Sequence, residues 1–103
     1  MKYQIRETYT AKRGKVPEYL ESLKVVIGFM KAGGIPNHTL CVDISGDLDT
    51  VYHEWEVDSL DDYFGFERGL YVDPDAQTQQ LIDHVNDITL SGKREIFEIL
   101  DID

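Results

Sequence analysis

His53 is the residue of this chain best suited to acid–base chemistry. It alternates with Trp55 in a segment that reads as a strand, and both side chains then share a face with Val42 of the preceding segment. An imidazole beside an indole can bind a planar ligand or act as a general base near neutral pH. We take His53 as the candidate general base and Trp55 as a candidate substrate-binding residue. A half-buried histidine that only hydrogen-bonds a neighbour is the alternative.

A second group of polar residues falls on the other face of the same strands. Tyr52, Glu54 and Glu56 alternate there, Asp43 lies across the predicted hairpin, and Arg6 can reach this face from the first strand. Carboxylates around one arginine can hold shifted pKa values and transfer protons. Arg6 is therefore a candidate catalytic residue that would stabilise an anion or enolate, with Tyr52 and Glu54 as substrate-binding candidates. A salt-bridge network on a solvated face or across a dimer interface is the alternative. The candidate base His53 faces the other way, which counts against a single active site that contains both groups.

We expect no metal and no bound cofactor. The single cysteine, Cys41, excludes a disulfide within the chain and a multi-cysteine metal site. No loop has the ligand spacing of a calcium site, and no haem motif flanks His84. Gly33 and Gly34 close a predicted helix instead of opening one, so no phosphate-binding loop is present.

Length and charge narrow the class of protein. A chain of 103 residues is expected to form one domain, residues 1–103. Ten basic residues against twenty acidic ones give a net charge of −10, which argues against nucleic acid and anionic membranes as partners. No apolar run is long enough for a membrane span and no signal peptide is recognisable. We therefore expect an acidic cytoplasmic protein.

The first half of the chain predicts a strand, a helix and a hairpin. Alternation indicates a strand over Lys2–Thr10, and an apolar stripe indicates a helix over Val16–Ala32. The segments Asn37–Ser45 and Thr50–Asp58 follow as the two strands of a hairpin. A four-residue loop, 46–49, would pair residues whose numbers sum to 95, such as 42 with 53.

The second half predicts two helices and a last strand. Ser59 is an N-cap that begins a short helix extending to about Leu70. Asp73, followed by Pro74, is the predicted cap of a further helix that ends near residues 91–92. The strand Lys93–Leu100 closes the chain, and its two apolar faces favour a central or doubly covered position.

The element order is β-α-β-β-α-β, with a split second helical region. This order predicts an α+β fold of the ferredoxin-like, split βαβ type, in which helices cover one face of an antiparallel sheet. The other face would be buried by pairing two sheets in a homodimer. We expect Phe97 or Leu100 in that interface.

Several motifs resemble the dimeric α/β-barrel superfamily. The opening Arg6-Glu7-Thr8-Tyr9 with Arg13-Gly14-Lys15, and the closing Gly92-Lys93-Arg94-Glu95-Ile96-Phe97, are similar to its first and last strands. The segment from Asp43 to Leu60, with Ser-Gly, an Asp-containing loop and a Trp/Glu-rich strand, resembles the NIPSNAP-like branch.

This resemblance implies a homodimer, a pocket between sheet and helices, and little about activity. The superfamily includes cofactor-free monooxygenases of antibiotic biosynthesis, haem-degrading enzymes and muconolactone isomerase-like enzymes. Two classes of function therefore stay open. The first is a small-molecule-binding or structural homodimer whose ligand would be small and hydrophobic or aromatic. The second is a cofactor-independent monooxygenase or isomerase that acts on an aromatic or polyketide-like substrate.

Overall fold

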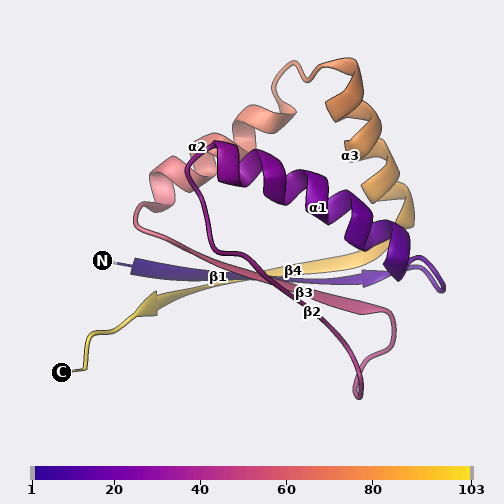
Figure 1. Cartoon of the computed structure of the whole chain (residues 1–103), viewed down its shortest axis with the longest axis horizontal. Helices are drawn as coiled ribbons and strands as arrows, with labels where there is room; N and C mark the ends of the chain where they lie inside the picture. The colour runs from indigo at the N-terminus through magenta and orange to yellow at the C-terminus, as the bar shows by residue number, and fades with distance from the viewer. Residues whose placement is uncertain (1, 103) are drawn as a thin grey trace.

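The computed structural model describes residues 2–102, in which three helices cover one face of a four-stranded antiparallel sheet (Figure 1). The elements are β1 (Lys2–Ala11), α1 (Val16–Ala32), β2 (Thr39–Val42), β3 (Thr50–Val57), α2 (Leu60–Tyr71), α3 (Ala76–Ile88) and β4 (Thr89–Ile99). The spatial strand order is β2-β3-β1-β4. The predicted ferredoxin-like α+β fold is confirmed. Within residues 2–102, none of the helices combines the length and apolar character needed to cross a membrane.

Helices α1 and α2 begin where their sequence signals predict. Pro17 and Glu18 occupy the first turn of α1, where a missing N–H costs nothing and a carboxylate complements the helix dipole. The chain leaves α1 through Gly34, whose φ of 90° suits glycine. The Ser59 hydroxyl accepts a hydrogen bond from the Asp62 amide at 3.1 Å and caps α2.

The predicted cap of α3 is wrong by two residues. Asp75, not Asp73, is the N-cap, and its Oδ1 accepts a hydrogen bond from the Thr78 amide at 2.8 Å. Pro74 disfavours the right-handed helical region for the residue before it, and Asp73 adopts a φ of 50°. Asp73 therefore belongs to the turn between the helices.

The predicted register of the hairpin is also wrong. Leu40 pairs with His53, so paired residues sum to 93 instead of 95. The strand β2 ends early because Asp43 leaves the ladder, and its Oδ1 accepts a hydrogen bond from the Thr50 amide at 3.2 Å. Asp49 with a φ of 58° completes a longer loop. A shift of two residues keeps every side chain on its predicted face, because side chains alternate with period two.

The strand β4 begins earlier than predicted and lies at the edge of the sheet. Thr89 already pairs with Ala11, so α3 ends at Ile88 and leads directly into the strand. Of the two predicted positions, central or doubly covered, the central one is wrong, since β4 pairs only with β1. Phe97 and Ile99 are 40% and 37% exposed, so apolar side chains of β4 are only partly covered within one chain.

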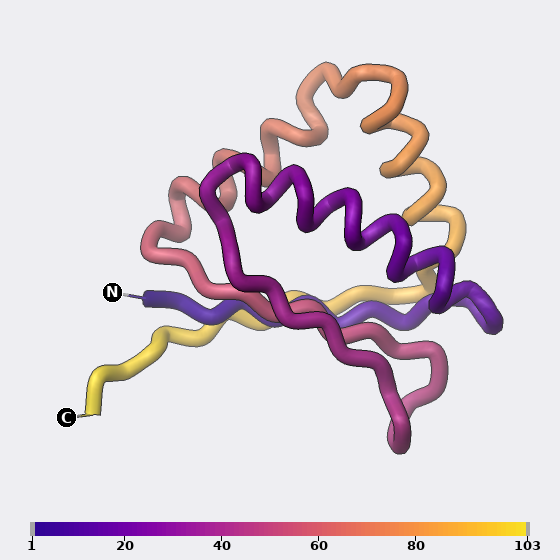
Figure 2. The backbone as a smooth tube through the Cα atoms, viewed as in Figure 1, coloured from indigo at the N-terminus to yellow at the C-terminus, as the bar shows by residue number. Residues whose placement is uncertain are grey.

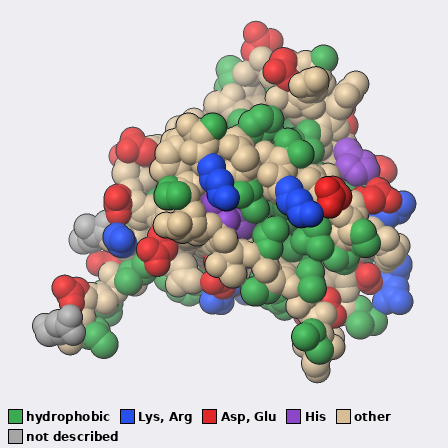
Figure 3. Space-filling view, viewed as in Figure 1, with side chains coloured by type: hydrophobic (Ala, Val, Ile, Leu, Met, Phe, Trp, Pro, Cys, Tyr) green, Lys and Arg blue, Asp and Glu red, His purple; other side chains and the backbone are tan. Residues whose placement is uncertain are grey.

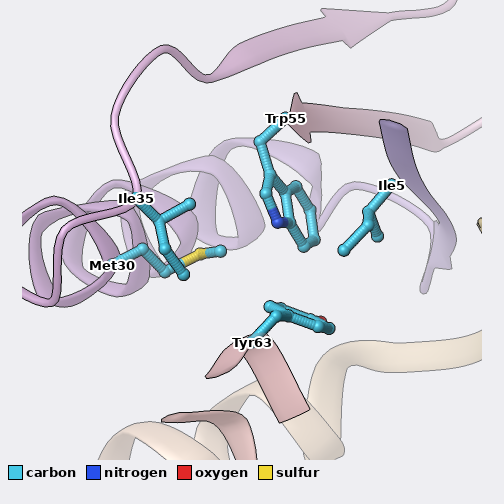
Figure 4. Close-up of a cluster of buried hydrophobic side chains, with 5 residues drawn as sticks. All are labelled: Ile5, Met30, Ile35, Trp55 and Tyr63. Carbon is cyan, nitrogen blue, oxygen red and sulfur yellow. The ribbon is translucent and has the colours of Figure 1, made fainter. Parts of the chain in front are cut away.

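The core between sheet and helices consists of two apolar clusters. The first contains Ile5, Met30, Ile35, Trp55 and Tyr63 (Figure 4). The second contains Ala11, Tyr19, Leu23, Val51 and Ile88. Figure 2 shows that α1 lies along the sheet, whereas α2 extends away from the sheet and α3 leads back to it.

Candidate functional site

A row of paired residues, three of them polar, crosses the sheet between the two apolar clusters. Arg94 pairs with Glu7, Glu7 with His53, and His53 with Leu40, on β4, β1, β3 and β2. Directly opposed residues of an antiparallel sheet have Cβ atoms about 5 Å apart. The alternation of the strands directs this row toward the helices, since His53 is buried on the same face as Trp55.

A cavity of about 210 Å³ lies above this row, beneath the helices. Glu7 and Glu67 supply its carboxylates, and His53 supplies an imidazole. Six aromatic side chains line it: Tyr9, Tyr19, Trp55, Tyr63, Phe66 and Tyr71. A concave, mostly apolar site with a few convergent polar groups is typical of small-molecule binding.

Gly92 allows one of these rings to reach the cavity. It pairs with Tyr9 across β1 and β4, and a Cβ at residue 92 would lie 2.9 Å from Cδ1 of that ring. The ring of Tyr9 therefore lies over the glycine backbone, 5.4 Å from the ring of Tyr19. Any larger residue at this position would displace a wall of the cavity.

Arg94 joins the two carboxylates of the cavity. Its Nε and Nη2 donate to Glu7 Oε2 at 3.0 and 2.9 Å, and Nη2 also donates to Glu67. Burial raises the pKa of Tyr9 and Tyr63, and the charge of Glu7 raises both further. These phenols therefore stay protonated at neutral pH.

His53 is linked to His38, and the direction of the link follows from chemistry. His38 Nε2 lies 2.7 Å from the Ile35 carbonyl oxygen, which only accepts, so this nitrogen carries a hydrogen. In the neutral ring His38 Nδ1 is then an acceptor, and His53 Nε2, 2.9 Å away, donates to it. His53 Nδ1 is thereby left unprotonated. Burial, and to a lesser extent His38, lowers the pKa of His53 to about 4, so the ring is neutral at pH 7.

The ring of Trp55 lies between those of His53 and Tyr63. Its ring centroid lies 4.4 Å from that of His53 and 5.6 Å from that of Tyr63. The indole Nε1 is buried and has no hydrogen-bond partner among the residues that the structure describes. Figure 4 shows this nitrogen on the side of the ring that faces Met30. A buried donor without an acceptor is uncommon and is costly.

The other sequence-predicted site residues lie on the opposite face of the sheet. Arg6, Tyr52 and Glu54 alternate with the cavity-facing residues, so His53 and Trp55 are separated from them by the sheet. Arg6 Nε donates to Glu54 Oε1 at 2.6 Å, and the Arg6 guanidinium lies 5.4 Å from the ring centre of Phe97. Arg6, Tyr52 and Glu54 do not line the cavity that holds His53, but Glu54 and Trp55 both line a larger hollow beside it.

A larger hollow of about 620 Å³ lies beside the cavity, and Trp55, Tyr63 and Phe66 line both. The turn 33–37 and the segment 56–59 supply much of its remaining lining. The hollow lacks His53, Glu7 and Glu67, and its charged lining residues are Lys2, Glu54, Glu56, Asp58 and Asp62.

Sequence reasoning missed Glu7, Glu67, Arg94 and the role of His38. Glu7 stands in an alternating run with Ile5 and Tyr9, so an acidic residue at an inward position was the available signal. Arg94 and Glu67 carry no such signal, because only the register and the placement of α2 bring them to Glu7.

Comparison with solved structures places this architecture among known proteins. A NIPSNAP family protein from Agrobacterium tumefaciens superposes with a TM-score of 0.82 at 23% identity, over 99% of this chain and 96% of the other. An uncharacterised NIPSNAP domain protein from Burkholderia xenovorans superposes with a TM-score of 0.77 at 20% identity, over 99% and 97%. The chain has a NIPSNAP-like fold. The resemblance predicted from the sequence motifs is therefore confirmed at the level of the fold.

The NIPSNAP-like fold is also similar to that of an enzyme. SnoaB, a cofactor-independent oxygenase from Streptomyces nogalater, superposes with a TM-score of 0.70 at 11% identity, over 97% of this chain and 94% of the other. No model of a sequence family matches the chain, and no curated protein sequence matches it. At these identities the similarity concerns the fold, so function must be argued from the site.

Proposed function

We propose that this protein is a homodimer that binds a small aromatic molecule in the cavity between its sheet and helices. The observation that carries the proposal is the lining of that cavity, where six aromatic side chains surround Glu7, Glu67 and His53. Aromatic side chains offer large apolar faces, and the few polar groups would orient the ligand. The volume of about 210 Å³ is below the usual range for drug-sized ligands, which favours a molecule of one or two rings.

Binding of 4-propylphenol is the direct test. Trp55 is the only tryptophan of the chain and lines the cavity, so its fluorescence is expected to change in a saturable way as the phenol is added. Val26 lines the cavity, whereas Val25 is 49% exposed. We expect Val26→Phe to fill the space and weaken binding at least tenfold, and Val25→Phe to leave it unchanged. Equal affinities of the two variants would contradict the proposed location.

The homodimer would cover the sheet face that carries no helix. Figure 1 shows the β2–β3 loop and the C-terminal segment both extending to that side of the sheet. Ile44 and Leu48 are exposed on the loop, and Leu100 and Ile102 on the C-terminal segment. Figure 3 shows hydrophobic side chains at both projections. Together with the exposed Phe97, they would contact a second sheet, and Arg6, Tyr52 and Glu54 would lie inside that interface.

Sedimentation velocity tests the assembly. We expect a particle of twice the mass of one chain, and dissociation when Phe97→Asp places a carboxylate in the apolar interface. Tyr71→Asp, at an exposed aromatic residue on the helical side, is the matched control and is expected to leave the dimer intact. A wild-type monomer at micromolar concentration would reject the dimer.

A second candidate, a cofactor-independent monooxygenase or isomerase, is favoured by the hydrogen bond from His53 to His38. That bond orients a neutral imidazole with an unprotonated Nδ1, so His53 would be the general base and Trp55 a wall of the substrate site. With 1-naphthol, the oxygenase would transfer one atom of O₂ to the ring, release the other as water and form 1,4-naphthoquinone. We expect equal oxygen uptake and quinone formation, both lost in His53→Gln. No quinone above the uncatalysed rate would reject the oxygenase candidate.

A further inference from the structure

The cavity carries an uncompensated negative charge. Glu7 and Glu67 line it, and Arg94 is the one guanidinium bonded to both. No lysine or arginine occurs among the described residues that line the cavity, and His53 is neutral there at pH 7. Two carboxylates against one guanidinium leave one formal negative charge beside a largely apolar space, where charges interact more strongly than in water.

The aromatic lining suits a cation as well. The guanidinium carbon of Arg94 lies 5.7 Å from the ring centre of Tyr63 and 5.9 Å from that of Phe64, within the range of a cation–π contact. Tyr9 and Tyr71 add two more rings on the cavity side of the cluster. An ammonium group among these rings would meet π faces and a carboxylate together. The net charge of −10 would also raise the local concentration of cations.

An independent observation concerns Trp55, another residue of the cavity lining. Trp55 is only 2% exposed and lines the cavity, and its Nε1 has no acceptor among the described residues. An acceptor oxygen of a ligand would satisfy this donor. Trp55 and Glu7 are diagonal neighbours on β3 and β1, because Glu7 pairs with His53, two residues from Trp55. The Cα atoms of diagonal neighbours are about 7 Å apart, so both side chains can border a space that holds one ring with a short side chain.

We propose that the ligand of this cavity is a protonated aromatic amine that also carries an acceptor oxygen. The ammonium group would donate to Glu7, the ring would lie among the aromatic side chains, and the oxygen would accept from Trp55 Nε1. The inference rests on the proposed function, since it names the class of the small aromatic ligand.

Four probes separate the contributions of the ammonium group and the oxygen to binding. The affinity of each probe is measured by calorimetry at pH 7. Tyramine carries the ammonium group and the oxygen, 4-propylphenol replaces the ammonium group by a methyl group, 3-(4-hydroxyphenyl)propionate replaces it by a carboxylate, and phenethylamine lacks the oxygen. We expect tyramine to bind about tenfold more tightly than 4-propylphenol, since a charged hydrogen bond contributes that much. The propionate is expected to bind most weakly, and phenethylamine severalfold more weakly than tyramine.

Substitutions then connect each preference to one residue. Glu7→Gln is expected to remove most of the preference for tyramine over 4-propylphenol, and Glu67→Gln, which also neutralises the cluster, provides a second variant if the first does not fold. Glu98→Gln is the matched control, because Glu98 is an exposed glutamate of β4 outside the cavity lining. Trp55→Phe is expected to abolish the difference between tyramine and phenethylamine.

The outcomes distinguish this inference from the proposed function. If 4-propylphenol and tyramine bind with equal affinity, or the propionate binds best, the amine inference is overturned and an aromatic-binding cavity remains. If none of the four probes binds, the proposed function falls together with the inference. A preference for tyramine that survives both Glu7→Gln and Glu67→Gln would also overturn it, because the charge would then lie elsewhere.

Discussion

Acidification from pH 6.5 to pH 4 is expected to destabilise the fold by up to about 3 kcal/mol through His53 alone. Burial, and secondarily His38, lowers the pKa of His53 from 6.5 to about 4 in the folded chain. Between these pH values, His53 therefore binds a proton in the unfolded chain but stays neutral in the folded chain. Stability from this group is complete above pH 6.5 and is lost as the pH falls toward 4, at about 1.4 kcal/mol per pH unit.

Urea unfolding across this pH range measures the effect. His53→Gln keeps a nitrogen that can donate to His38 and removes the titration, so the variant is expected to lose about one proton from the slope of stability against pH. His84→Gln, on the exposed surface of α3, is the control for removing one imidazole from the chain. The other groups beside His53, including Glu7 across β1, are common to all three proteins. Identical slopes for wild type and His53→Gln would contradict the buried neutral imidazole.

Arg94→Met is expected to lower the free energy of unfolding by about 2 kcal/mol. Removing one partner of a buried ion pair costs 3–5 kcal/mol, and we discount this because the Arg94 side chain is about one-third exposed. The variant leaves Glu7 and Glu67 facing each other without their shared donor. Arg94→Lys keeps the charge but loses the forked geometry, so an intermediate loss is expected.

Two further variants test whether repulsion between Glu7 and Glu67 causes the loss of stability in Arg94→Met. Adding Glu67→Gln to Arg94→Met is expected to recover at least half of the lost stability, because one of the two repelling charges is removed. Lys93→Met affects the neighbouring residue, an exposed lysine that pairs with Glu95 at 3.7 Å, and should cost less than about 1 kcal/mol. An Arg94→Met variant that is as stable as Lys93→Met in urea titrations would show that the cluster contributes little.

Local sequence signals predicted the elements that depend on local chemistry. The limits of α1 follow from its apolar stripe, Pro17 and the glycines after it, and α2 begins at Ser59 as its capping residues indicate. The errors occur where a competing local interaction intervenes. Asp43 replaces a backbone acceptor and ends β2 early, and Pro74 moves the start of α3 to the second aspartate. The edge position of β4 was missed because an apolar strand face does not reveal which surface covers it.

The candidate site was predictable only in part. Alternation in β3 places His53 and Trp55 on one face and Glu54 on the other, as the structure does. The partners of His53 were not predictable, because His38 precedes β2 after an irregular turn that no sequence period describes. The Glu7–Arg94–Glu67 cluster joins residues up to 87 positions apart, and it depends on the register of two strand pairs and on the placement of α2.

The position of β1 has a consequence for how the chain folds during synthesis. Among the four strands of this sheet, β1 leaves the ribosome before the others and is a central strand, whereas its outer neighbour β4 leaves after the others, with Lys2 paired to Ile99. Until β3 and then β4 have emerged, β1 has unpaired edges, while α1 can already form. Closure of this long-range ladder should therefore limit the folding rate, and a chain halted before residue 89 would expose one edge of β1 to aggregation.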